Sequence, residues 1–166
     1  MDPMDRTAVV AALEASLRHL ERVVSRLDEA KATVRPTPER WSPMETLEHL
    51  VVVERGIHKS VTAASGAAAT DLRTRQMDSV IAGAGTVTRA LVAPDVVAPT
   101  GRFHSVHEAL VLFRERRITT INLARTLDVP WDAHHMTHPI LGPLDIGQWF
   151  LLAATHVDRH LPQIEV

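Results

Sequence analysis

The chain has 166 residues, of which 45% are hydrophobic and 23% charged, and this balance is typical of a globular domain able to bury its own core. Its formal net charge is −2, so the overall charge indicates neither a nucleic-acid partner nor a membrane surface. The chain contains no Cys, which excludes disulfides, thiolate nucleophiles and sulfur-ligated metal sites, and it contains 10 His.

The N-terminal sequence MDPMDRTAVV has acidic residues and no basic leader before an apolar stretch, so it is not typical of a signal peptide. No apolar run reaches the roughly 18 residues of a membrane-spanning helix. We therefore expect a soluble, cytoplasmic protein with a single domain over residues 1–166.

The first predicted helix runs from about Pro3 to Lys31, where apolar residues recur at helical spacing. Asp2 is its expected N-cap, because the following Pro3 suits the first position of a helix. The prolines of VRPTPERWSP then interrupt the helical pattern.

Three later helices are predicted from capping signatures, in which an N-cap Ser or Asp is followed three residues later by Glu or Gln. The pairs are Ser42 with Glu45, Ser105 with Glu108, and Asp145 with Gln148. The helix after Ser42 is predicted to end near Ser65, and the helix after Ser105 to end before Pro130. The helix after Asp145 is predicted to continue to about Ile164.

Residues 66–103 show no clear pattern beyond a short helix at DLRTRQMDSV, and we expect a long crossover connection there. No segment has the alternation of a half-buried strand. Four amphipathic helices with a long crossover between the second and third predict an all-α four-helix bundle.

Two histidines in the last predicted helix, His156 and His160, are four residues apart and therefore lie on one face. The apolar stripe of this helix includes Ala153, Val157 and Leu161, so both histidines lie within or beside its buried side. A buried imidazole needs a polar partner, and a shared metal ion would satisfy both rings. The pair alone fits equally well two core histidines with ordinary hydrogen-bond partners.

His49 is the best candidate for a third ligand, since catalytic zinc sites commonly have three protein ligands. It lies at the edge of the apolar arc of the second helix, on the side of Val53, Gly56 and Ser60. These small side chains would leave room for a cavity. An ordinary histidine at the boundary of the core explains the position of His49 at least as well.

A rival cluster of histidines, His134, His135 and His138, lies in the HHMTHP segment. A flexible loop without an apolar shell would bind a metal weakly, so we expect this cluster not to be the main site. His138 directly precedes the last helix, and we expect it near the mouth of the pocket.

Glu54 lies on the apolar side of the second helix and needs a partner there. It is either a carboxylate near the site or the partner of a buried arginine such as Arg117, which falls in the apolar stripe of the third helix. We favour the ion pair.

Two motif blocks carry a family resemblance, RWSPMETLEHLVVVE at 40–54 and HPILGPLDIGQWFLLAATHVDRHLPQI at 138–164. They resemble the DinB-like superfamily, in its group of YfiT-like metal-dependent hydrolases. GRFHSVHEALVLFRERR between the blocks also fits, so the resemblance covers most of the chain. It implies an up-down-down-up bundle that binds a divalent metal through His49, His156 and His160.

The same resemblance implies the kind of function. In relatives the metal is Zn²⁺ or Ni²⁺, some members are thiol transferases that use bacillithiol, mycothiol or glutathione, and others are hydrolases. We therefore expect a metal-dependent enzyme acting on a small molecule, with a low-molecular-weight thiol as one candidate partner and homodimers formed through helix faces. Catalytic residues beyond the metal ligands are not indicated. The alternative is a helical bundle that binds a metal or ligand without catalysis.

Overall fold

The computed structural model describes residues 1–83 and 94–165. Its long helices are α1 (Arg6–Val24), α3 (Pro43–Gly66), α5 (Val106–Thr126) and α6 (Ile146–Ile164). The short elements between them are α2 (Glu29–Ala32), the 3-10 helix η1 (Arg75–Met77), α4 (Asp78–Ala82), η3 (Asp95–Val97), η4 (Trp131–Ala133), and the strands β1 (His135–His138) and β2 (Gly142–Asp145). None of the described helices is both long and apolar enough to cross a membrane.

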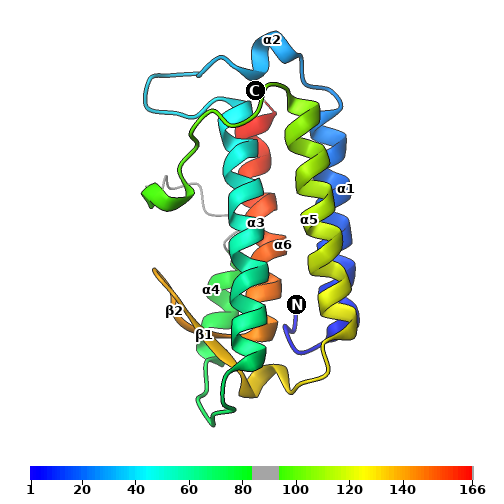
Figure 1. Cartoon of the computed structure of the whole chain (residues 1–166), viewed down its shortest axis with the longest axis vertical. Coiled ribbons are helices and arrows are strands. Elements are labelled where there is room, and N and C mark those ends of the chain that lie inside the picture. The colour runs from blue at the N-terminus through cyan, green and yellow to red at the C-terminus, as the bar shows by residue number, and fades with distance from the viewer. Residues whose placement is uncertain (84–93, 166) are drawn as a thin grey trace.

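The four long helices form a bundle in which α1 and α3 each pack against both α5 and α6. In the view of Figure 1 the chain runs up α1, down α3, down α5 and up α6. The connection between α3 and α5 joins opposite ends of the bundle, so these two successive long helices run in the same direction; its residues 84–93 lie outside the described part of the chain. This arrangement confirms the predicted all-α four-helix bundle with a long crossover between its second and third helices.

The first helix is shorter than the predicted Pro3–Lys31. Asp5, not Asp2, is its N-cap, because the Asp5 carboxylate accepts a backbone amide of the first turn at 3.0 Å. At the other end α1 stops at Val24, and Asp28 caps the separate helix α2. A second capping carboxylate therefore interrupts what the apolar periodicity predicted as one continuous helix.

The three predicted N-caps are confirmed. Ser42 and Asp145 each form a complete capping box with the residue three positions on, at the starts of α3 and α6. Ser105 accepts the Glu108 amide at 3.0 Å, but the Glu108 carboxylate bonds to the His104 amide instead of the Ser105 amide. The caps fix where the helices that carry the candidate site begin.

The prediction that the chain contains no strands was wrong. Strands β1 and β2 form a short antiparallel hairpin before α6, and the Trp149 indole donates to the Met136 carbonyl at 3.2 Å. Gly142 has a φ of 78°, which a residue without a Cβ adopts readily at the turn. Both strands have only four residues, and β2 begins with Gly and Pro, so they are too short for alternation to show in the sequence.

A buried ion pair joins all four long helices near the middle of the bundle. Arg117 on α5 is 0% exposed and donates to the Glu54 carboxylate on α3 at 2.7 and 2.8 Å. The same guanidinium donates to the Leu13 carbonyl on α1 at 3.2 Å and the Ala153 carbonyl on α6 at 2.8 Å. The expected pairing of Glu54 with Arg117 is confirmed, and it fixes α6 one turn before His156.

This ion pair divides the core into two apolar clusters. One cluster includes Ile57 of α3 and Ile121 of α5, and the other includes Val51 and Phe113 of the same two helices. The second cluster also contains Val157 of α6, directly after His156. The candidate metal centre thus lies beside the cluster at the end of the bundle where α3 begins and α6 ends.

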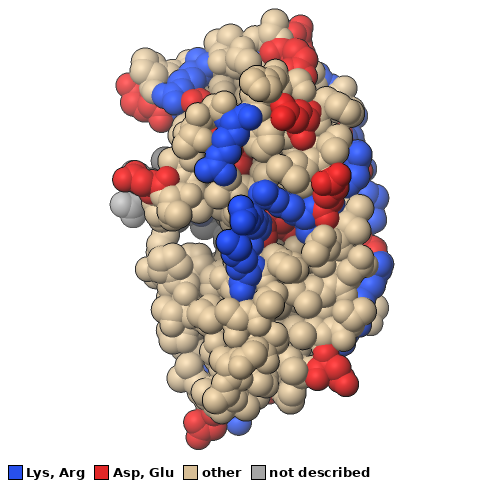
Figure 2. All heavy atoms as spheres, in the orientation of Figure 1, with Lys and Arg blue, Asp and Glu red and all other residues tan. Residues whose placement is uncertain are grey.

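Basic side chains gather over the face formed by α3 and α5. Figure 2 shows Lys and Arg side chains together in the middle of this face, in the orientation of Figure 1. Burial and the nearby charges of Arg55 and Arg102 lower the pKa of Arg116, whose guanidinium donates to the Val51 carbonyl at 2.6 Å. The charge of the protein is therefore unevenly distributed despite its small net value.

Candidate metal centre

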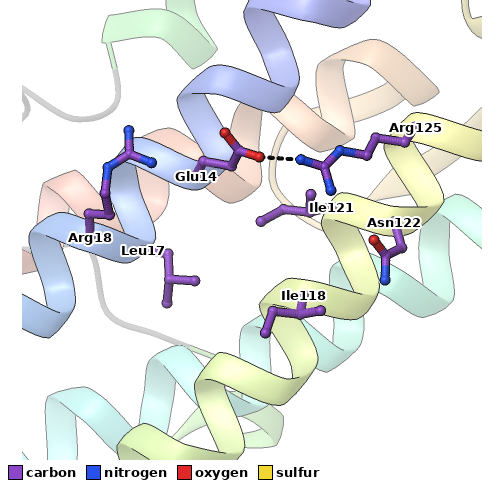
Figure 3. A pocket seen from close by; sticks show the side chains of 7 residues that line it. All are labelled: Glu14, Leu17, Arg18, Ile118, Ile121, Asn122 and Arg125. Carbon is purple, nitrogen blue, oxygen red and sulfur yellow. Dashed lines mark hydrogen bonds and ion pairs between the residues drawn. The ribbon is translucent and has the colours of Figure 1, made fainter.

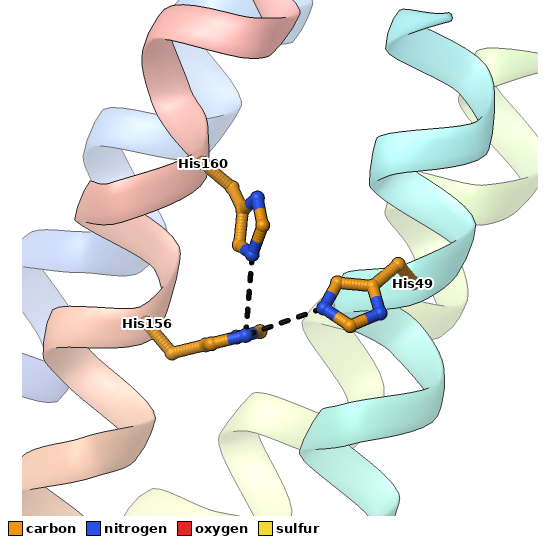
Figure 4. A group of neighbouring side chains, drawn as sticks. All are labelled: His49, His156 and His160. Atoms are coloured by element: carbon orange, nitrogen blue, oxygen red, sulfur yellow. Dashed lines mark hydrogen bonds between the residues drawn. The ribbon is translucent and has the colours of Figure 1, made fainter. Parts of the chain in front are cut away.

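Three imidazole rings from two helices meet inside the bundle. His49 on α3 faces His156 and His160 on the antiparallel helix α6, with the ring nitrogens directed toward one another (Figure 4). The distance from His156 Nε2 is 3.3 Å to His49 Nε2 and 3.2 Å to His160 Nε2. Within residues 1–83 and 94–165, this is the group of His, Asp and Glu side chains whose geometry could hold a metal ion.

Hydrogen bonds on the far side of two rings fix which nitrogen carries the proton. His49 Nδ1 lies 2.8 Å from the Val97 carbonyl, and His160 Nδ1 lies 2.5 Å from Gln163 Oε1. Both oxygens can only accept, so Nδ1 donates in each case and Nε2 keeps its lone pair. The lone pairs of His49 and His160 therefore point at His156 Nε2, as ligands held by outer hydrogen bonds do in metal sites.

The surroundings keep these imidazoles neutral. Burial lowers the pKa of His49, lowers that of His160 to about 4 and lowers that of His156 well below the ordinary histidine range. Arg159 lowers all three further, and Arg117 adds to the effect on His156. Neutral imidazole is the form that binds a metal ion, so the three rings are in the ligand state at neutral pH.

The donor set fits a divalent cation. His156 Nε2 can donate a proton to only one of its two neighbours, so at least one of the two short nitrogen contacts joins lone pairs with no proton between them. A cation among the three nitrogens would satisfy every lone pair at once. Three imidazoles and an open position are a common ligand set for catalytic Zn²⁺, and imidazole also suits Ni²⁺, Cu²⁺ and Fe²⁺.

The rival histidines of the hairpin segment do not converge. Their Nδ1 atoms bond to separate partners: His134 to the Ala67 carbonyl, His135 to the Thr70 hydroxyl, and His138 to the Ile140 and Leu141 amides. The His138 ring lies against Trp149 at 5.3 Å between centroids, about two turns of α6 before His156. The structure therefore does not place His138 in the three-histidine group.

A surface groove of about 380 Å³ lies away from the histidines, between α1 and α5 (Figure 3). Its lining residues are Glu14, Leu17, Arg18, Ile118, Ile121, Asn122 and Arg125. An ion pair between Glu14 and Arg125 crosses the groove. The groove contains no histidine and is formed by different helices from those of the three-histidine group.

The sequence predicts a cavity on the side of α3 that carries Val53 and Gly56. On that side Gly56 is exposed and Val53 is half-buried against the core.

Sequence reasoning missed the groups that surround the three candidate ligands. Gln163 follows His160 by three residues on the same helix, and this spacing is a signal that could have identified it. The partner of His49 is the backbone carbonyl of Val97, which no residue type reveals. Trp41, whose ring centroid lies 5.0 Å from that of His49, forms an aromatic wall on this side.

Comparison with known proteins identifies the family. The family model of the DinB superfamily matches residues 12–164, which is most of the chain. The chain belongs to the DinB superfamily. The resemblance of the two motif blocks to this superfamily is thereby confirmed.

A solved structure shares the DinB superfamily fold with this chain. YfiT from Bacillus subtilis is similar with a TM-score of 0.68 at 14% sequence identity, over 99% of this chain and 86% of that chain. YfiT is described as a probable metal-dependent hydrolase with an unusual four-helix bundle topology. At this identity the similarity shows a common fold. A comparison with curated proteins gives no match.

Proposed function

We propose that this DinB superfamily protein is a metal-dependent enzyme that hydrolyses a small molecule beside a cation held by His49, His156 and His160. The observation that carries the proposal is the convergence of three Nε2 atoms, two of them with their lone pairs fixed by outer hydrogen bonds. The description of YfiT as a probable metal-dependent hydrolase supports the same reaction class. Zn²⁺ and Ni²⁺ are the proposed cations, because imidazole suits both and the family resemblance implies them.

The charge of the site indicates the chemistry. Three neutral imidazoles leave a divalent cation its full charge, and the positive charge of Arg159 acts on all three rings while that of Arg117 acts on His156. A bound cation would supply Lewis-acid catalysis and favour an anionic ligand such as hydroxide or thiolate. The role of the chain itself is to hold three neutral rings in place and to keep them from taking up protons.

Thiol transfer is the second candidate reaction, because the same positive site would favour a thiolate. The chain has no Cys, so the thiol would have to come from a low-molecular-weight cosubstrate. A third candidate is a bundle that binds a metal and gains stability from it without catalysis.

A substrate screen with the metal-loaded protein distinguishes these candidates. Ester and amide substrates would be tested with and without chelator, and thiol transfer would be tested with bacillithiol, mycothiol and glutathione. We expect hydrolysis that is lost with chelator, returns with Zn²⁺ or Ni²⁺ and is absent in His156→Ala. Thiol-dependent turnover alone would favour the transferase. Metal-dependent stabilisation without turnover would contradict an enzymatic role.

A further inference from the structure

Residues 94–102, called the strap here, lie against α3 beside the candidate metal centre. The strap contains the 3-10 helix η3, which contacts α3, and the Val97 carbonyl that accepts from His49 Nδ1 at 2.8 Å. The ligand of the candidate centre on α3 is therefore oriented by a segment from the connection between α3 and α5.

The strap is anchored to α3 by Glu48, the residue directly before His49. The Glu48 side chain is 1% exposed, and its carboxylate accepts the amides of Thr100 at 2.6 Å, Gly101 at 3.0 Å and Arg102 at 3.2 Å. Successive amides that converge on one carboxylate form strong, charge-assisted bonds. The φ of 77° at Gly101 produces the turn that directs these amides to one point.

Glu48 and His49 therefore both contact the strap, but Glu48 accepts hydrogen bonds from it and His49 donates one to it. Glu48 holds the strap through three amides, while the Val97 carbonyl of the strap holds His49. Consecutive helix residues are about 100° apart, so both side chains can reach one neighbouring segment. The geometry connects a buried carboxylate, whose hydrogen bonds go to residues 100–102, to the orientation of the His49 ring.

We infer that Glu48 is a positioning residue of the metal centre: by anchoring the strap it keeps Val97 against His49 and leaves His49 Nε2 free to bind the metal. This inference rests on the proposed metal centre. Coupling is reciprocal, because a cation on Nε2 makes the Nδ1 proton a stronger donor to the Val97 carbonyl. Metal binding therefore also stabilises the strap.

The first test is the Glu48→Gln variant, which removes the charge and presents an amide to the strap. A matched control is Glu115→Gln, at an exposed carboxylate on α5. We expect the affinity for Zn²⁺, measured by chelator competition, to fall about ten- to a hundredfold in Glu48→Gln and to stay unchanged in the control. Nitrogen NMR should show His49 protonated at Nδ1 in the wild type and a mixture of tautomers in Glu48→Gln, a change that a purely structural role would not produce.

A second variant leaves α3 untouched. In Gly101→Ala the added Cβ would have no neighbouring atom within 4 Å, so the core should not be disturbed. The φ of 77° is unfavourable for Ala, so the substitution should strain the turn and loosen the strap. We expect weaker Zn²⁺ binding in this variant, and in the wild type we expect Zn²⁺ to slow hydrogen exchange at the Thr100, Gly101 and Arg102 amides. Wild-type Zn²⁺ affinity and an unchanged His49 tautomer in both variants would overturn the inference and leave the metal centre intact. A wild type that binds no Zn²⁺ would overturn the metal centre and this inference with it.

Discussion

The Arg117 guanidinium donates two hydrogen bonds to the Glu54 carboxylate in the middle of the bundle, at 2.7 and 2.8 Å. Removing one member of a buried pair leaves the other charge without a partner. We expect Glu54→Ala to lower the free energy of unfolding by about 3–5 kcal/mol, as measured by urea denaturation of the metal-free protein.

A surface ion pair provides the control for this prediction. Glu14 pairs with Arg125 where both side chains are partly open to solvent, so Glu14→Ala should change the free energy of unfolding by less than about 1 kcal/mol. Replacing Glu54 and Arg117 together by Leu and Met should recover much of the loss. Equal effects of Glu54→Ala and Glu14→Ala would show that the buried pair does not hold the helices together.

The stability of the metal-free protein should depend on pH in a specific window. An unfolded histidine binds a proton near pH 6.5, whereas the pKa of folded His160 is lowered to about 4 and those of His49 and His156 are also lowered. Between these values the unfolded chain binds more protons than the folded one, so the free energy of unfolding falls as the pH drops from about 6.5 toward about 4. Denaturation at a series of pH values measures this slope.

His160→Gln removes one of these titrating groups and should make that slope shallower. Excess Zn²⁺ should also shift the loss of stability to lower pH, because protons must then compete with the metal for the same nitrogens. An identical slope in the wild type and His160→Gln would show that His160 keeps its ordinary pKa in the folded protein.

The Gln163 side chain should contribute to metal affinity without contacting the metal. Gln163→Leu removes the acceptor of the His160 Nδ1 proton, and we expect Zn²⁺ affinity to fall about ten- to a hundredfold. Gln163→Glu keeps an acceptor oxygen and should retain most of the affinity. Chelator competition on both variants measures the difference, and equal affinities for Leu and Glu would show that this hydrogen bond does not orient His160.

The helical face of His156 and His160 could be predicted from spacing alone, since four residues make one helical turn and the apolar stripe lies alongside. His49 could not be assigned in this way, because its proximity to the other two histidines depends on the antiparallel packing of α3 against α6. The family resemblance indicated that His49 belongs with His156 and His160. The pairing of Glu54 with Arg117 could be anticipated, because two charged residues on buried faces require each other.

Other features depend on interactions that residue types do not show. The strap contacts Glu48 and His49 largely through its own backbone amides and the Val97 carbonyl. Val97 therefore carries no signal in the sequence, and Glu48 resembles any other helical glutamate. Asp2 and Asp5 are equally suitable N-caps by residue type, and only the helix geometry selects Asp5. The hairpin before α6 depends on pairing between two segments that show no alternation on their own.

Elemental analysis tests the metal centre most directly, on protein purified without a histidine tag and incubated with Zn²⁺ or Ni²⁺. The comparison includes His49→Ala, His156→Ala and, as a control, His104→Ala, whose side chain is exposed outside the site. We predict about one divalent ion per chain in the wild type and His104→Ala, and loss of the ion in the other two variants. A wild type without metal, or full metal content in His156→Ala, would contradict the three-histidine centre.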